Sequence, residues 1–413
     1  MENTNKIKFY VSAILTLTSP LHIGNGMDDN TDSDILMTKD NKPFIPASTL
    51  AGKSRHTLQE LQLSDIDVDA LYGSISKDKN ESKLIFYDAD IITKKFAVTI
   101  RDNVRINEYG VAMDKGKFDY EILESGSSFL FRGELLCDSE ESGKSVFGII
   151  LGLINNGDIT FGAKTARGLG QMTVSMPKYL SIDLYNEMPK YIDFHWYKSD
   201  KDNELNNEQI NEDLELLLPS KMLYEKRTIN FDIESYLLVR NYSTLATHDN
   251  KIVSSEQLMN ANKKAVIPGT SWAGVFRHHI ERILSLSGYT DPDELVNTVF
   301  GYVNEDTKER RISHIRFSES TIDDKMKLRN RTRNAVDRFT GGAGDKKLYT
   351  TRPGFYGSGD LTISIPADLP QKQLIKSLID ICVDDLKEGF LNIGGEGSVG
   401  GGRMKITDGG SWI

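Results

Sequence analysis

The chain has 413 residues and a formal net charge of −10 at pH 7, with 38% hydrophobic and 27% charged residues. This length indicates two or three domains, and the apolar content excludes a wholly disordered chain. The longest apolar run, residues 146–154, is far shorter than the about 20 residues that cross a bilayer, and the first residues lack the apolar core of a signal peptide. The only two cysteines, Cys137 and Cys382, lie in no metal-binding pattern. We therefore expect a cytoplasmic protein without disulfides, structural zinc or a membrane partner, and its acidity argues against a protein that coats nucleic acid over its whole surface.

The first predicted element is a strand over residues 7–17, which leads into a loop, residues 24–34, with four carboxylates. An EF-hand is excluded because its sixth position would be Ser33 and its twelfth Lys39. Two interpretations remain open. The loop is a solvated acidic surface, or Asp32 or Asp34 faces a bound phosphodiester, where an aspartate can hold Mg²⁺ or take the proton from an attacking ribose 2′-hydroxyl.

A helix is predicted to begin at residues 45–48, where a proline ends an extended segment and Ser48 can cap the helix. Lys53 follows at a position that nearly completes a phosphate-binding loop, with Ala47 in place of its first glycine. The corresponding residue later in the chain is Val275, so we do not expect nucleotide hydrolysis here.

The elements that follow complete a domain pattern. We predict a strand at 83–88, a helix at 145–154, a strand at 158–161 and a strand at 171–175. This order of strands and helices is typical of a ferredoxin-like domain. The glycine-rich segment 162–170 suits either a structural turn or close approach of the backbone to phosphate, and Gly168 and Gly170 are expected to have positive φ or to meet RNA.

The chain then repeats itself. Residues 267–278 match residues 45–56 at six of twelve positions, including Arg277 for Arg55, and the glycine-rich segment recurs at 394–404 with Gly400 and Gly402. An alternating stretch near Ile229 opens the second copy. We predict an α+β protein with two tandem domains, residues 1–198 and 229–413, joined by an acidic linker or insertion at 199–228.

The second copy contains a basic strip, residues 325–338, with six basic residues and one acidic residue. The charges alternate, which predicts an extended strand with Arg329, Arg331 and Arg333 on one face. The strip is either a solvated charged strand or a contact for phosphates.

The order of these motifs resembles the RAMP superfamily, and within it the backbone subunits of type III CRISPR effector complexes. The motifs are residues 21–24, 45–48, 101–121, 168–170 and 331–342. Two fused copies look most like the double subunits of the type III-D branch. The resemblance implies RNA-recognition-like ferredoxin domains with β-hairpin thumbs, within about 101–121 and 329–352. It also implies three kinds of partner, namely CRISPR guide RNA, target RNA and other effector-complex subunits.

The resemblance further implies cleavage of target RNA by an aspartate of the acidic loop. That aspartate corresponds to Asp34, with Asp32 as the alternative. The second copy has no aspartate at this position, and Glu256 is the nearest acid by spacing, so cleavage by the second domain is not expected.

On this interpretation the protein serves antiviral defence as a guide-RNA-binding backbone subunit. It acts either as an endoribonuclease, with Asp34 as catalytic residue and as ligand of a possible Mg²⁺ cofactor, or as a non-catalytic scaffold. The residues expected to contact RNA are Lys53, Arg55, Arg101, Arg105, Lys164, Arg167, Gly168, Gly170, Arg277, Arg329, Arg331, Arg333, Gly400, Gly402 and Arg403.

Overall fold

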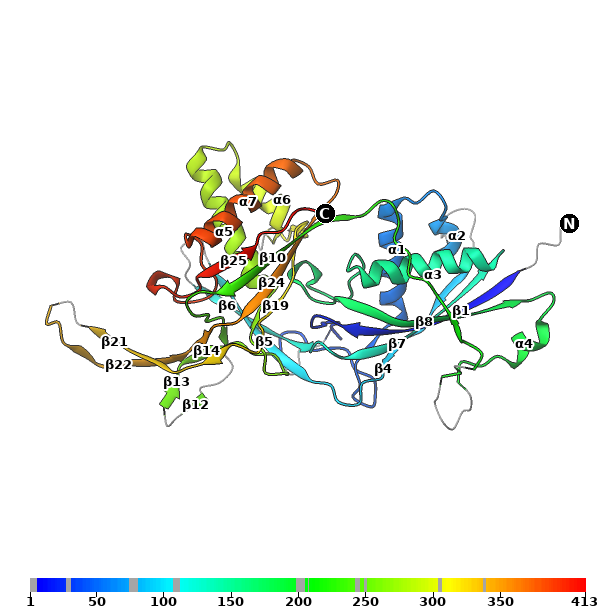
Figure 1. The fold of residues 1–413 in the computed structure, drawn as a ribbon, viewed down its shortest axis with the longest axis horizontal. Coiled ribbons are helices and arrows are strands. Elements are labelled where there is room, and N and C mark those ends of the chain that lie inside the picture. Colours follow the sequence, from blue (N-terminus) through cyan, green and yellow to red (C-terminus); the bar gives the residue numbers. More distant parts are fainter. Residues whose placement is uncertain are drawn as a thin grey trace. The chain divides into compact units, whose positions relative to one another are not determined.

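The computed structural model describes residues 6–26, 31–73, 81–106, 112–197, 205–206, 208–241, 246–248, 251–303, 307–336 and 339–413. Their contacts divide the chain into two compact units (Figure 1). Unit 1 consists of Met1–Thr99, Glu121–Thr165 and Leu169–Leu223. Unit 2 consists of Ile100–Tyr120, Ala166–Gly168 and Tyr224–Ile413, so two short segments from the first half of the chain belong to it.

Unit 1 is built on a seven-stranded sheet. Its strands lie in the order β2 (Phe44–Ile45), β4 (Ala89–Ile91), β7 (Ser128–Cys137), β1 (Ile7–Leu17), β8 (Met172–Asp183) and β9 (Glu212–Asp213), and β3 (Leu84–Phe86) also pairs with β7. The central strand β1 is antiparallel to both β7 and β8. The predicted first strand is therefore confirmed, and it lies at the centre of the sheet.

Both faces of this sheet are covered by parts of unit 1. The helices of the unit are α1 (Ala47–Leu61), α2 (Val68–Tyr72), α3 (Glu140–Asn155) and α4 (Met188–Asp193). Apolar residues of α1 and α3, such as Leu50 and Phe147, form one core with Phe9 of β1. On the alternate side of β1, Tyr10 packs against Phe194 and Trp196, as expected from the period-2 alternation of side chains along a strand.

Unit 2 repeats this strand order in a four-stranded sheet. The strands are β18 (Arg316–Phe317), β24 (Ser358–Pro366), β10 (Tyr224–Ile233) and β25 (Met404–Asp408), which correspond to β3, β7, β1 and β8 of unit 1. The helices are α5 (Gly269–Ser287), α6 (Pro292–Phe300) and α7 (Lys372–Glu388). Trp272, Phe276, Ile280 and Leu284 of α5 are buried in the core, as their helical spacing predicts.

Two hairpins accompany the sheets. In the first, β5 (Val98–Ile106) pairs with β6 (Ala112–Leu123). In unit 2, β21 (Arg331–Val336) and β22 (Ala343–Arg352) form a sheet with β14 (Ser255–Gln257) and β11 (Arg240–Asn241). Figure 1 shows β21 and β22 extending away from helices α5, α6 and α7 of the same unit.

The remaining short elements complete unit 2. They are β12 (Ala246–His248), β13 (Lys251–Val253), β15 (Val266–Ile267), β16 (Tyr302–Val303), β17 (Arg310–Arg311), β19 (Ser320–Thr321), β20 (Lys327–Leu328), β23 (Gly354–Phe355) and the 3₁₀ helix η2 (Gly397–Val399). Its counterpart η1 (Thr165–Arg167) follows α3. None of the helices in the described parts of the chain is long and apolar enough to cross a bilayer.

The α+β class with antiparallel sheets is confirmed, and two local predictions are wrong. Residues 158–161 are not a strand, because Asp158 and Ile159 donate to Leu153 O at the end of α3 and Phe161 donates to Gly170 O. Ser48 does not cap α1, since Pro46 is the N-cap residue. Instead, the Asp88 carboxylate accepts a hydrogen bond from Ala47 N at 2.7 Å.

Part of the predicted acidic linker is built into unit 1. Within residues 199–228, β9 pairs with β8, and Leu214 beside it is buried in the core of unit 1. Residues 198–204 and 207 lie outside the described residues. The domain limits expected from the sequence stay a prediction.

Candidate nucleic-acid interface

The acidic loop of unit 1 is held at its base by His22. The buried imidazole contacts Glu121 O through Nδ1 at 2.7 Å and Ser33 Oγ through Nε2 at 3.1 Å. Because a carbonyl oxygen only accepts, Nδ1 carries the proton and the neutral ring accepts at Nε2. Burial lowers the pKa of His22, and Lys164 lowers it further, while the contact with Glu121 opposes the shift. The loop is thus fixed at residues 22 and 33.

Glu121 fixes the other arm of the same loop. Its carboxylate accepts a hydrogen bond from Ile35 N at 3.0 Å, and its own N–H donates to Ser33 O at 3.1 Å. Gly24 also pairs with Ile35 across the loop. Residues 27–30 of the loop lie outside the described residues.

The two aspartates predicted to act in catalysis differ in burial. The Asp34 residue is only 4% exposed, and its Oδ1 accepts from Thr31 N at 2.9 Å and from Thr31 Oγ1 at 2.8 Å. Asp32 is exposed. Asp34 therefore stabilises the loop conformation itself, whereas Asp32 faces solvent.

No complete metal cage is formed by the side chains of the described residues. In those parts of the chain no three His, Cys, Asp or Glu side chains lie close enough together to hold a metal ion. Mg²⁺ is commonly held by one or two carboxylates together with substrate phosphates and waters. A single aspartate of this loop fits only that shared mode of binding.

The glycine-rich segments have matching backbone geometry in the two units. Gly168, Gly170, Gly400 and Gly402 all have positive φ, as predicted. A Cβ atom on Gly170 would lie 1.8 Å from Phe161 O, and one on Gly402 would lie 2.1 Å from Ile393 O. At these two positions only glycine fits, because both φ and space exclude a side chain.

Residues Lys164 and Glu396 occupy corresponding positions in these segments. Both have positive φ, 58° and 64°, just before η1 and η2. The first unit therefore presents a cation where the second presents an anion.

Arg329, Arg331 and Arg333 of the basic strip lie at or near the start of β21, and each contacts an aromatic residue. Arg329 precedes the strand and lies over Phe355 and Tyr356, with 5.9 Å to each ring centroid. Arg331 lies 4.3 Å from the centroid of Tyr236, and Arg333 donates to the Tyr236 hydroxyl at 2.8 Å. The predicted strand is confirmed for Arg331 and Arg333, which share one face with Tyr236.

Two other predicted RNA-binding arginines are bonded to the end of α6. Arg277 donates to Gly301 O and to Asn297 Oδ1, both at 2.7 Å. Arg167 donates to Phe300 O at 2.9 Å. Burial lowers the pKa of Arg167 to about 10, with a further contribution from the charge of Arg277. These two cations satisfy backbone carbonyls that a helix leaves unpaired at its C-terminus.

The other predicted cations have varied surroundings. Arg55 pairs with Asp69 of α2 at 3.0 Å, and Arg101 pairs with Glu319 at 3.2 Å in an ion pair whose two side chains are each 7% exposed. Arg403 lies 3.4 Å from Glu234. Lys53 lies half-buried on α1. Arg105 lies on β5, and its side chain is outside the described part of the structure.

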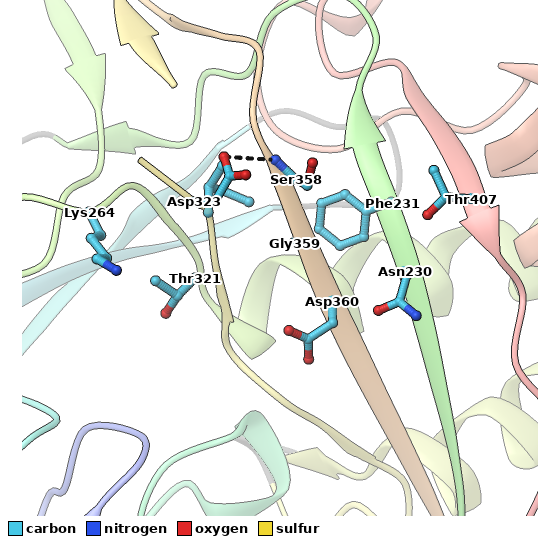
Figure 2. Close-up of a pocket in the computed structure, with 10 residues that line it drawn as sticks. Asn230, Phe231, Lys264, Thr321, Asp323, Ser358, Gly359, Asp360 and Thr407 are labelled. Carbon is cyan, nitrogen blue, oxygen red and sulfur yellow. Dashed lines mark hydrogen bonds between the residues drawn. The ribbon is translucent and has the colours of Figure 1, made fainter. Parts of the chain in front are cut away.

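One hollow of about 400 Å³ lies on unit 2, beside β10 and β24 (Figure 2). Asp323, Asp360 and Lys264 line it, and Asp323 accepts a hydrogen bond from Ser358 N at 3.2 Å. Burial raises the pKa of Asp360. The lining carries two carboxylates and one lysine and includes none of the residues predicted to bind RNA, so it offers a phosphate no cluster of cations.

Sequence reasoning missed the groups that hold the predicted residues in place. Thr31 bonds Asp34, Glu319 pairs with Arg101, and Tyr236 and Glu396 contact the arginines of β21. Except for Thr31, each of these partners is far in sequence from the residue that it contacts, and its residue type alone does not indicate a functional role. The recurrence of the glycine segment places Glu396 opposite Lys164 already in the sequence, but it does not indicate what Glu396 contacts.

A family model, the RAMP superfamily, matches residues 14–173 and 248–405. These two matches cover more than half of the chain, so the chain belongs to the RAMP superfamily. The superfamily consists of CRISPR-associated proteins that bind CRISPR RNA and other complex subunits. No curated protein matched the chain.

Proposed function

We propose that this protein is a guide-RNA-binding backbone subunit of a type III CRISPR effector complex, of the kind in which two copies are fused. The observation that carries the proposal is the arginine-bearing hairpin β21–β22, which lies within the second RAMP match. Arginines that alternate along a strand and lie on aromatic rings suit a sugar–phosphate backbone, because cations supply affinity and rings offer stacking surfaces.

The proposed architecture is a tandem pair of ferredoxin-like domains with hairpin thumbs. Both units have a central strand between two antiparallel neighbours, with a helix in each of the two crossover connections. This is the strand and helix order of a ferredoxin-like fold. The β5–β6 and β21–β22 hairpins occupy the same place in that order and correspond to the proposed thumbs.

For the reaction, we propose that Asp34 takes part in cleavage of target RNA, with Asp32 as the alternative. Cleavage by a ribose 2′-hydroxyl needs a group that accepts its proton and an in-line arrangement of the reacting atoms. The support is that the loop carrying Asp34 is fixed by His22 and Glu121, so the carboxylate has a defined position. A Mg²⁺ ion shared between Asp34 and RNA phosphates is part of this proposal.

One observation favours a non-catalytic scaffold. Asp34 is buried and its Oδ1 already accepts two hydrogen bonds from Thr31, which is a sufficient structural role for a carboxylate. In unit 2 no cleavage is proposed. The Glu256 carboxylate lies 3.7 Å from Arg352 in an ion pair, at a place where the sequence has no counterpart of Asp34.

A single experiment separates nuclease from scaffold. The assembled complex is given a labelled RNA complementary to its guide, and products are followed over time with Mg²⁺ and with EDTA. If Asp34 acts as the base, Asp34→Asn should slow cutting by about 10² to 10⁴ while guide binding stays intact. Asp32→Asn should have a smaller effect, and Glu256→Gln serves as a control that should keep every product band.

The outcomes are distinct. A wild-type complex that binds the target and leaves it whole supports the scaffold. Fast cutting by Asp34→Asn together with slow cutting by Asp32→Asn assigns the reaction to the exposed aspartate. Replacing Arg329, Arg331 and Arg333 together with Ala should weaken guide binding; unchanged affinity would contradict the RNA-binding proposal itself.

A further inference from the structure

The arginines of β21 share one internal carboxylate. Glu396 lies in the loop before η2, and its side chain is only 6% exposed. Its Oε2 is 3.0 Å from Arg333 Nη2 and 3.8 Å from Arg331 Nη1. Two cations and one anion leave a single positive charge at the base of the hairpin.

The tyrosine beneath them fixes the geometry. The Tyr236 hydroxyl donates to Glu396 Oε2 at 3.0 Å and accepts from Arg333 Nη2 at 2.8 Å. Arg333, Tyr236 and Glu396 therefore form a closed ring of hydrogen bonds and charge. The Arg333 side chain is 18% exposed, so its guanidinium is directed inward.

Arg331 is held differently. The centre of its guanidinium lies 4.3 Å from the centroid of the Tyr236 ring, and its side chain is 35% exposed. Its Nη1 is buried and makes no hydrogen bond to any residue that the structure describes. A phosphate oxygen can reach only the exposed part of this side chain, and a guanidinium has further N–H donors besides those at Nη1.

We propose that Glu396 decides which arginines of the strip bind RNA: it neutralises Arg333 internally and positions Arg331 on Tyr236 to contact a backbone phosphate. This inference rests on the proposed function and makes it specific. Glu396 and Arg333 are positioning residues, and Arg331 is the phosphate ligand. The anion at this position is particular to unit 2, because unit 1 has Lys164 there.

The salt dependence of RNA binding can count the cations that meet phosphate. On single strands each phosphate contact contributes about −0.7 to the slope of log K against log salt concentration. The full-length protein is titrated with a labelled single-stranded RNA of mixed sequence over a range of salt. Arg331→Ala should make the slope less steep by about 0.7. The double variant Arg333→Ala/Glu396→Gln removes one cation and one anion together and should leave the slope unchanged.

Removal of the carboxylate is the decisive change. Glu396→Gln keeps the shape of the side chain but frees the charge of Arg333, so the slope should become steeper by about 0.7. Adding Arg333→Ala to Glu396→Gln should return it to the wild-type value. Arg310→Ala, an exposed cation on β17 outside the strip, is the matched control and should change nothing.

The failures are separable. If wild-type protein does not bind RNA, both the proposed function and this inference are overturned. If it binds, but the double variant Arg333→Ala/Glu396→Gln flattens the slope as much as Arg331→Ala, or Glu396→Gln leaves the slope unchanged, only the inference is overturned. Circular dichroism establishes that each variant is folded, and the comparison of Arg331→Ala with the double variant decides alone should Glu396→Gln fail to fold.

Discussion

At the scale of single residues, His22 connects the protonation state of one ring to the stability of the acidic loop. The neutral ring donates to Glu121 O and accepts from Ser33 Oγ. Protonation would turn Nε2 into a donor and place a charge in a buried site beside Lys164, which is why the pKa is lowered.

This arrangement predicts a loss of stability in acid. The unfolded chain takes up a proton on His22 near the ordinary pKa of about 6.5, while the folded protein takes it up only at lower pH. The unfolded state therefore binds more protons as pH falls below that value, and the free energy of unfolding decreases. His22→Gln should reduce this acid-side decrease.

Urea unfolding of wild type and His22→Gln at about pH 8 and about pH 5 measures the effect. The pH 8 pair is the control, since imidazole is neutral in both states there and the difference reports only lost hydrogen bonds. The same drop between the two pH values in both proteins would contradict the assignment.

At the residue scale, sequence reasoning located several side chains but not their partners. The loop carrying Asp34, the arginines of β21 and the four glycines were all singled out. Their contacts with Glu121, Tyr236, Glu319 and Glu396 depend on residues far apart in the chain being brought together, which spacing and composition do not encode.

At the scale of elements, the glycine segments set a graded test of backbone constraint. Gly402 has positive φ, and a Cβ atom there would meet Ile393 O at 2.1 Å, whereas Gly400 has positive φ with nothing within 4 Å. Gly52 lies in helix α1 with nothing within 4 Å of a Cβ atom. Alanine at Gly402 tests steric overlap together with a left-handed backbone, alanine at Gly400 tests the left-handed backbone alone, and alanine at Gly52 tests neither effect.

Alanine substitution should follow that order. Gly402→Ala should destabilise unit 2 most, Gly400→Ala should cost about 1–2 kcal/mol from its left-handed backbone alone, and Gly52→Ala should be neutral or stabilise by up to about 1 kcal/mol. Urea unfolding measures all three. Equal losses for Gly402→Ala and Gly400→Ala would show that the close approach to Ile393 is relieved by a backbone shift.

Long amphipathic elements were predictable, and short or irregular ones were not. The apolar spacing of α5 and the alternation of β1 follow from burying one face against a core. The segment 158–161 has the composition of a strand, yet its N–H groups bond to the end of α3 and to Gly170. Its apolar side chains are buried by tertiary packing, a cause that local pattern does not distinguish from a sheet.

At the scale of the whole molecule, the compact units do not follow the linear order of the two regions that the family model matches. Residues Ile100–Tyr120 and Ala166–Gly168 belong to unit 2. Through them Arg101 pairs with Glu319, and Arg167 bonds to Phe300 O. The repeat was visible in the sequence, but the membership of these two segments in unit 2 was not. Each partner residue is polar, and nothing in its neighbouring sequence marks it as a contact of a distant segment.

Because unit 2 contains residues from both halves of the chain, the effect of one substitution on its stability should depend on whether the first half is present. In the full chain Glu319→Gln breaks the buried ion pair with Arg101 and should cost about 3–5 kcal/mol. In a fragment of residues 224–413, Arg101 is missing and the carboxylate becomes exposed, so the same change should have little effect.

The midpoints of urea unfolding are compared for the full chain and for the fragment, each with and without Glu319→Gln. Glu294→Gln, which breaks the exposed ion pair with Arg311, is the control and should cost about 0–1 kcal/mol in either background. An equal loss from Glu319→Gln in chain and fragment would mean that Arg101 does not stabilise unit 2. A fragment that fails to fold would show that the segments from the first half are required.

The membership of these two early segments in unit 2 has a consequence for the order in which the protein folds during its synthesis. Gly168 leaves the ribosome 245 residues before Ile413, as 413 − 168 = 245. At about 5–20 residues per second, the β5–β6 hairpin and Arg167 wait about 10 to 50 seconds for the rest of unit 2. During that interval Arg101 and Arg167 cannot yet make the contacts with Glu319 and Phe300 O that they make in unit 2. The last contacts of unit 2 therefore form only after most of the chain has been made, although some of the residues that make them belong to its first half.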